Sequence, residues 1–129
     1  VVGRSHRTVS SFKESIIAVL EEISIETTIQ VKFSVAIDNN NQFIADALFL
    51  SSTPLAVVIA NSRERLLEAE LMWTNARRLG DPTRVFAVIE NQSDVGQKEY
   101  VRANYFTDKT FQYSGFENPF KQTLADCLN

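Results

Sequence analysis

The fold is decided by residues 41–91, which read NQFIADALFLSSTPLAVVIANSRERLLEAELMWTNARRLGDPTRVFAVIEN. Within this stretch, three apolar segments bounded by turn residues predict β-strands at 42–50, 55–60 and 84–89. Apolar residues also recur at helical spacing over 63–79, which predicts a helix between the last two strands. Two consecutive strands joined by a helix run parallel, so we expect strands 55–60 and 84–89 to be parallel neighbours.

The segment before this stretch predicts a helix and the first strand of a hairpin. Ser11 and Glu14 fit a capping box, and apolar positions at helical spacing follow them, so we expect a helix at 11–24. Residues 28–37 alternate between apolar and polar side chains, which is typical of a half-buried strand with one face on the core. The Asp- and Asn-rich turn at 38–41 then favours an antiparallel hairpin with the next strand.

The segment after the stretch predicts smaller elements: a helix at 97–105, a strand at 110–113 and a final helix at 118–128. Residues 1–10 show no periodicity, and we interpret them as a linker or disordered lead-in to a single domain at 11–129. The fold class that follows is α/β. We expect a three-layer α-β-α arrangement, in which a mixed sheet of four to five strands lies between two layers of helices.

Composition excludes several classes of protein. The chain has 129 residues, 44% of them hydrophobic, a net charge of −3 and one cysteine, Cys127. It is long enough for a packed core, cannot form an intramolecular disulfide, and lacks an overall basic surface for nucleic acid. The only histidine, His6, falls in the expected lead-in, which argues against Ser/His or Cys/His catalysis. Because no apolar run approaches the ~20 residues that span a bilayer, we expect a cytoplasmic protein with no membrane partner.

Asp46 is the most informative single residue, because it places a charge inside an otherwise apolar strand. A buried carboxylate is costly unless a cation, a metal ion or a hydrogen-bond donor compensates it. Two interpretations follow. Asp46 is either a metal ligand, or it is satisfied by a backbone amide or by an arginine such as Arg65.

The order helix, strand, strand, strand, helix, strand over residues 11–91 resembles the core of the PD-(D/E)xK nuclease superfamily, which has the restriction-endonuclease-like fold. In that family the second strand carries an aspartate, and the third carries Glu or Asp followed two residues later by Lys. The two carboxylates hold Mg²⁺, and the lysine assists the attacking water. The resemblance therefore implies that Asp46 is the second-strand carboxylate and a metal ligand.

The third strand departs from the family pattern, because residues 55–61 (LAVVIAN) contain neither the acid nor the lysine. Some family members carry these groups on the following helix, where Glu64 and Glu68 lie one turn apart. Asp46, Glu64 and Glu68 are therefore the candidate catalytic residues. The first predicted helix offers further acids: Glu14, Glu21 and Glu22. A weaker resemblance is to small phage and mobile-element domains with this layout and an eroded motif.

Two groups of side chains suggest binding surfaces. The candidate nucleic-acid contacts are Arg77, Arg78, Arg84 and Lys98, although a solvated helix end is the plainer explanation for them. The C-terminal third is rich in aromatic residues that would stack on bases, form a second core or contact another subunit: Tyr100, Tyr105, Phe106, Phe111, Tyr113, Phe116 and Phe120.

The first functional hypothesis is a non-catalytic nuclease-fold domain without a cofactor. It would bind nucleic acid or a protein partner within a larger protein encoded by a phage or mobile element. The first alternative is a Mg²⁺-dependent DNA nuclease with a relocated active site. The second is a structural or dimerisation module that forms a homodimer.

Overall fold

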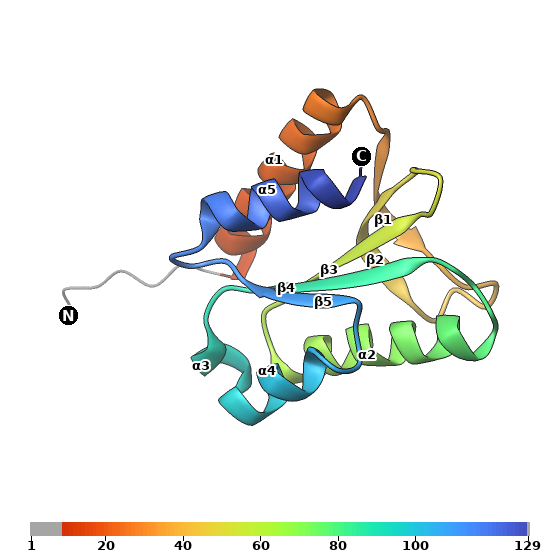
Figure 1. Cartoon of the computed structure of the whole chain (residues 1–129). Helices are drawn as coiled ribbons and strands as arrows, with labels where there is room; N and C mark the ends of the chain where they lie inside the picture. Colours follow the sequence, from red (N-terminus) through yellow and green to blue (C-terminus); the bar gives the residue numbers. More distant parts are fainter. Residues whose placement is uncertain (1–8, 129) are drawn as a thin grey trace.

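The computed structural model describes residues 9–128, which form one mixed sheet between two layers of helices (Figure 1). The strands lie in the order in which they occur in the chain: β1 (Val31–Ala36), β2 (Ile44–Phe49), β3 (Leu55–Ala60), β4 (Arg84–Ile89) and β5 (Lys109–Gln112). Strand β2 is antiparallel to both of its neighbours, whereas β3, β4 and β5 are parallel. The predicted hairpin, the parallel crossover and the mixed sheet are confirmed.

The helices divide between the two faces of the sheet. One face is covered by α1 (Val9–Thr27) and α5 (Glu117–Leu128), and the other by α2 (Arg63–Arg78), α3 (Gln92–Val95) and α4 (Gln97–Ala103) (Figure 1). This is the predicted three-layer arrangement. No helix within residues 9–128 has both the length and the apolar character that crossing a membrane requires.

Strand β3 lies in the middle of the sheet, and all six of its residues are buried. Its side chains alternate between the two layers, as the strand period requires. Val57 and Ile59 pack in the core cluster with α1 and α5, whereas Val58 and Ala60 pack with α2. A strand covered on both faces reads as one continuous apolar run, which is why its sequence predicts it well.

Helix α1 begins at Val9, so the predicted start at Ser11 and its capping box are wrong. Ser11 lies inside the first turns of the helix, and its carbonyl oxygen accepts a hydrogen bond from Ser15 Oγ at 3.0 Å. Extending an existing helix costs far less than nucleating one, so α1 continues beyond its apolar stripe. The expected lead-in therefore keeps only residues 1–8, which lie outside the described residues.

Strand β1 is shorter than predicted, and its alternation reverses. Val31 and Phe33 pack toward α1, as expected, but Ile37 packs against the cluster on the α2 face. The cause is Ser34, whose φ of +53° is left-handed and interrupts the extended backbone. The prediction that Ile37 shares one face with Val31 and Phe33 is therefore wrong.

Candidate functional site

The strand pairing is interrupted on both sides of Asp46. Between β2 and β3, the register of paired residues stops at Ala47 and Val57, one residue short of Asp46. On the β1 side, the register skips Ser34, the left-handed residue opposite Asp46. The carboxylate of Asp46 thus lies in a local opening of the sheet, where backbone groups and helix side chains can reach it.

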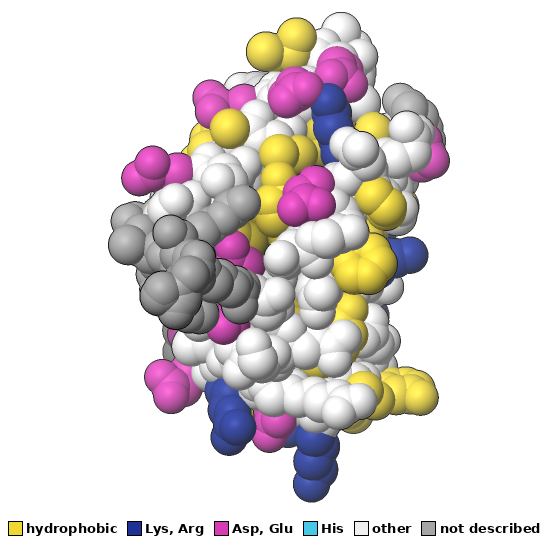
Figure 2. All heavy atoms as spheres, turned by 90° about the vertical axis from the view of Figure 1, so that its left-hand side faces the viewer, with side chains coloured by type: hydrophobic (Ala, Val, Ile, Leu, Met, Phe, Trp, Pro, Cys, Tyr) yellow, Lys and Arg dark blue, Asp and Glu magenta, His cyan; other side chains and the backbone are white. Residues whose placement is uncertain are grey.

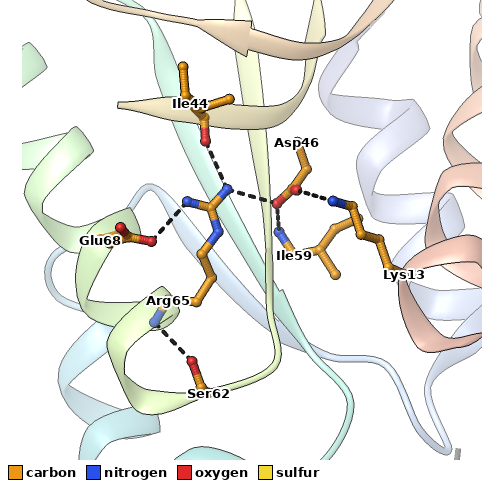
Figure 3. Close-up of polar contacts among 7 residues, drawn as sticks. All are labelled: Lys13, Ile44, Asp46, Ile59, Ser62, Arg65 and Glu68. Carbon is orange, nitrogen blue, oxygen red and sulfur yellow. Dashed lines mark hydrogen bonds and ion pairs between the residues drawn. The ribbon is translucent and has the colours of Figure 1, made fainter. Parts of the chain in front are cut away.

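The carboxylate of Asp46 is 8% exposed and is fully engaged (Figure 3). Its Oδ2 accepts hydrogen bonds from the backbone N–H of Ile59 at 2.6 Å and from Arg65 Nη2 at 3.0 Å. Its Oδ1 lies 3.3 Å from Lys13 Nζ. Lys13 comes from α1 and Arg65 from α2, so one acid receives a cation from each helical layer. The interpretation of Asp46 as an acid satisfied by a backbone amide and Arg65 is confirmed.

Arg65 links the helix to the sheet through further contacts. Its Nη2 donates to the carbonyl oxygen of Ile44 at 2.8 Å, and its Nη1 donates to Glu68 Oε1 at 3.0 Å (Figure 3). Its backbone N–H donates to Ser62 Oγ at 3.2 Å, so Ser62 is the N-cap of α2. The cap fixes the first turn of α2 and places the guanidinium group over the end of β2.

Of the two other predicted catalytic acids, Glu68 is linked to Asp46 through Arg65, which binds both carboxylates. Glu64 is exposed in the first turn of α2, and Glu68 is turned toward Arg65. Of the acids on α1, Glu22 pairs with Lys121 on α5. Within residues 9–128, no group of three or more His, Cys, Asp or Glu side chains could hold a metal ion. Asp46 is thus surrounded by cations where the nuclease resemblance implies a second carboxylate and a metal.

Two arginines of the predicted basic patch make contacts within the protein itself. Arg84 Nη1 donates to the carbonyl oxygen of Cys127 at 2.8 Å, and Arg84 Nη2 donates to that of Thr53 at 2.9 Å. Arg77 Nη2 donates to the carbonyl oxygen of Asp81 at 2.8 Å. These cations stabilise loops and a helix end instead of facing a ligand.

The other two predicted contacts, Arg78 and Lys98, are exposed on different helices, α2 and α4. Figure 2 shows the face opposite the C-terminal end of α2, and on that face basic side chains are separated by acidic, polar and hydrophobic ones. Binding to the phosphate backbone of a nucleic acid depends on clustered lysine and arginine side chains, and this face has no continuous cluster of them.

The aromatic cluster predicted in the C-terminal third is split. Phe111, Tyr113 and Phe120 are buried in the core between α5 and the sheet, with Phe111 and Phe120 edge to face at 5.1 Å. Tyr105 and Phe116 remain 74% and 53% exposed. Part of the cluster is therefore core, and part is available to a partner.

Two residues of the site escaped the sequence analysis. Lys13 lies off the apolar stripe of α1, like any solvated lysine, and only the folded chain brings it to Asp46. Ser34 is an ordinary strand residue in sequence, and no neighbouring glycine or asparagine signals its left-handed backbone. Its conformation is set by the structure around Asp46, not by its own preference.

Comparisons with protein-family models, with curated proteins and with solved structures find no match to this chain.

Proposed function

We propose that this chain is a non-catalytic domain of restriction-endonuclease-like fold that binds a protein partner. The element order supports the fold, since a helix, three strands, a helix and a parallel strand follow one another. The place of Asp46 supports it further: the acid lies on β2, where the sheet opens and where the resemblance expects the metal. The groups that surround this acid support the choice between catalysis and binding.

The observation that carries the proposal is that two cations and an amide occupy the Asp46 carboxylate. A catalytic Mg²⁺ needs carboxylate oxygens facing an open, hydrated position. Here Lys13 and Arg65 neutralise the acid and tie α1 and α2 to the sheet. The position has become a structural ion-pair network, which favours binding over hydrolysis.

A protein partner fits the charges better than nucleic acid does. The chain carries a net charge of −3, and Arg77 and Arg84 are engaged in internal contacts. Nucleic-acid affinity comes largely from cations that are free to neutralise phosphates. Exposed apolar side chains such as Tyr105 and Phe116 are instead typical of protein interfaces.

A Mn²⁺ titration tests the proposal that this domain does not cleave DNA. We expect no cleavage of plasmid or single-stranded DNA, and no calorimetric binding of Mn²⁺ that depends on Asp46. Asp46→Asn keeps the shape of the side chain, and Glu21→Ala removes an exposed acid on α1 as a matched control. Cleavage that is lost in Asp46→Asn and kept in Glu21→Ala would establish an enzyme and overturn the proposal.

Gel-shift measurements test the choice of partner. At about 50 mM salt we expect no complex tighter than the weak end of non-specific binding, a Kd of about 10⁻⁴ M. A tighter complex that dissociates steeply on raising the salt to about 200 mM would show phosphate contacts. That result would make nucleic acid the partner.

A further inference from the structure

A groove follows the outer edge of the sheet along β5, and we call it the β5 groove. Its volume is about 300 Å³. Its walls come from both helical layers, with Tyr100 on α4, Phe116 just before α5, and Pro119 and Phe120 on α5. The groove therefore lies against an edge strand, and its walls approach that strand from both sides.

Strand β5 is the last strand of the sheet, and within residues 9–128 it pairs only with β4. The outer side of such a strand presents backbone N–H and C=O groups that can accept another strand. Peptide-binding domains use such edges, with main-chain hydrogen bonds for affinity and side-chain pockets for specificity. The β5 groove therefore lies beside an edge that no other described strand pairs with, where Lys109 is exposed and Thr110 and Phe111 are buried.

The hollow is lined by aromatic and polar side chains, and its aromatic floor is packed. Phe111 and Phe120 are 9% and 2% exposed, and they pack edge to face. Phe116 lines the same groove but is 53% exposed, so much of its ring remains uncovered. Covering an exposed aromatic ring with an apolar side chain is favourable by roughly 25 cal/mol for each Å² removed from water.

The groove carries one charge, Lys109, on β5 itself. Its Nζ lies 5.6 Å from the centre of the Phe111 ring. Within the described part of the chain, no Asp or Glu forms an ion pair with Lys109. An acidic side chain on an incoming strand would complement this charge, whereas a basic one would be repelled.

We propose that the β5 groove binds an extended segment of another protein by strand addition. The segment places a large apolar side chain in the hollow and an Asp or Glu opposite Lys109. This inference rests on the proposed function, because it names the class of protein partner. A second copy of β5 fits less well: its sequence is Lys-Thr-Phe-Gln, so an antiparallel pair would place each Lys109 opposite a Gln112 and would offer it no acid from β5.

The probe is a displayed library of linear peptides about nine residues long, enough to form a strand, selected on the whole chain. We expect enrichment of peptides with a central large apolar residue and a nearby Asp or Glu. Amide NMR should then show the largest shift changes in β5. Lys109→Glu should weaken the selected peptide about tenfold, because it opposes two acids. Lys98→Glu, a charge reversal on exposed α4 surface, should change its affinity by less than about twofold.

A charge swap separates a direct contact from a general effect. Replacing the acid of the peptide by lysine should restore binding to Lys109→Glu and weaken binding to the unaltered chain. Phe116→Ser should also weaken the peptide, and its unfolding curve will show whether the fold persists.

Other outcomes would overturn the proposal. Failure to enrich any peptide, equal effects of the two lysine reversals, or shift changes away from β5 would each do so. Self-association in sedimentation that Phe116→Ser abolishes would make a second copy the occupant. A positive Mn²⁺ result at Asp46 would refute the proposed function without touching the peptide data, so the two failures are distinguishable.

Discussion

At the scale of single residues, Asp46 holds its position through three partners from three parts of the chain. Ile59 donates a hydrogen bond from β3, Arg65 donates one from α2, and Lys13 forms an ion pair from α1. A buried ion pair contributes little compared with well-packed apolar residues, but removing one partner leaves the other charge and a backbone amide uncompensated. Asp46 should therefore be sensitive to substitution even without any catalytic role.

We predict that Asp46→Ala lowers the free energy of unfolding by about 2–3 kcal/mol, because it leaves the Ile59 amide and the Arg65 guanidinium group without the carboxylate that accepts their hydrogen bonds. Urea denaturation measures this change. Lys13→Met is the matched control from the other end of the network. The Lys13 side chain is 44% exposed, so its loss should cost at most about 1 kcal/mol. Equal effects of the two substitutions would contradict this ranking.

A second prediction concerns the backbone of Ser34, which has a φ of +53°. Glycine adopts this conformation freely, whereas a β-branched residue resists it. Ser34→Val should therefore lower the free energy of unfolding by about 1–3 kcal/mol. Ser34→Gly should leave it unchanged or raise it by up to about 1 kcal/mol. If thermal melts rank valine above glycine, Ser34 is not strained.

At the scale of elements, the turn between β1 and β2 is organised by one carboxylate. Asp38 accepts hydrogen bonds from the backbone N–H groups of Phe43 at 2.9 Å, Gln42 at 3.2 Å and Asn40 at 3.3 Å. The bond from Phe43 is the main reason why the pKa of Asp38 is lowered, and partial desolvation opposes it. The hydrogen bonds that close the turn thus stabilise the ionised form of Asp38.

The sign of the pH dependence follows from this lowered pKa. The stabilisation is present above the usual value of 3.8 and is lost as pH falls through the lower pKa of the folded chain. We therefore predict that Asp38→Ala destabilises the chain at neutral pH and that the difference shrinks in acid. Carbon-detected NMR titration should place the Asp38 pKa below 3.8. Asn39→Ala, in the same turn, should leave the pH profile unchanged.

Elements with strong apolar patterns were predictable almost to the residue. Strands β3 and β4 have their predicted bounds, and α2 ends one residue early, at Arg78. Burial on both faces leaves such segments no room for polar residues, so the pattern is complete. The four-residue α3 was missed, because an element this short has no periodicity. It is set by local bonds such as Asn91 N–H to Asp94 Oδ2 at 3.1 Å.

At the scale of the whole molecule, the candidate site was predictable only in part. A charge in an apolar strand demands a partner, and this alone pointed to Asp46 and Arg65. Lys13 lies 33 residues before Asp46 in the chain, on a helix whose polar face gives no sign of which lysine turns inward. The internal contacts of Arg77 and Arg84 were unpredictable for a related reason: sequence shows where arginines are, but not which of them the fold uses to satisfy carbonyl groups.

Arg84 shows most clearly how an arginine that satisfies carbonyl groups can join distant segments of the chain. From the start of β4, its guanidinium group reaches the turn after β2 through the Thr53 carbonyl and the end of α5 through the Cys127 carbonyl. A cation at a helix C-terminus also offsets the partial negative charge there. Arg84 therefore couples the C-terminal helix to the central strands.

We predict that Arg84→Lys lowers the free energy of unfolding by about 1–3 kcal/mol, because one ammonium group cannot replace two separate guanidinium donors. Arg78→Lys is the matched control. Arg78 Nη2 donates only within its own helix, to Asn75 Oδ1 at 2.8 Å, so its replacement should change stability by less than about 0.5 kcal/mol. Hydrogen exchange should also show faster opening of α5 in Arg84→Lys but not in Arg78→Lys. If α5 stays protected while the whole chain loses stability, Arg84 acts through the turn after β2 and not through the helix end.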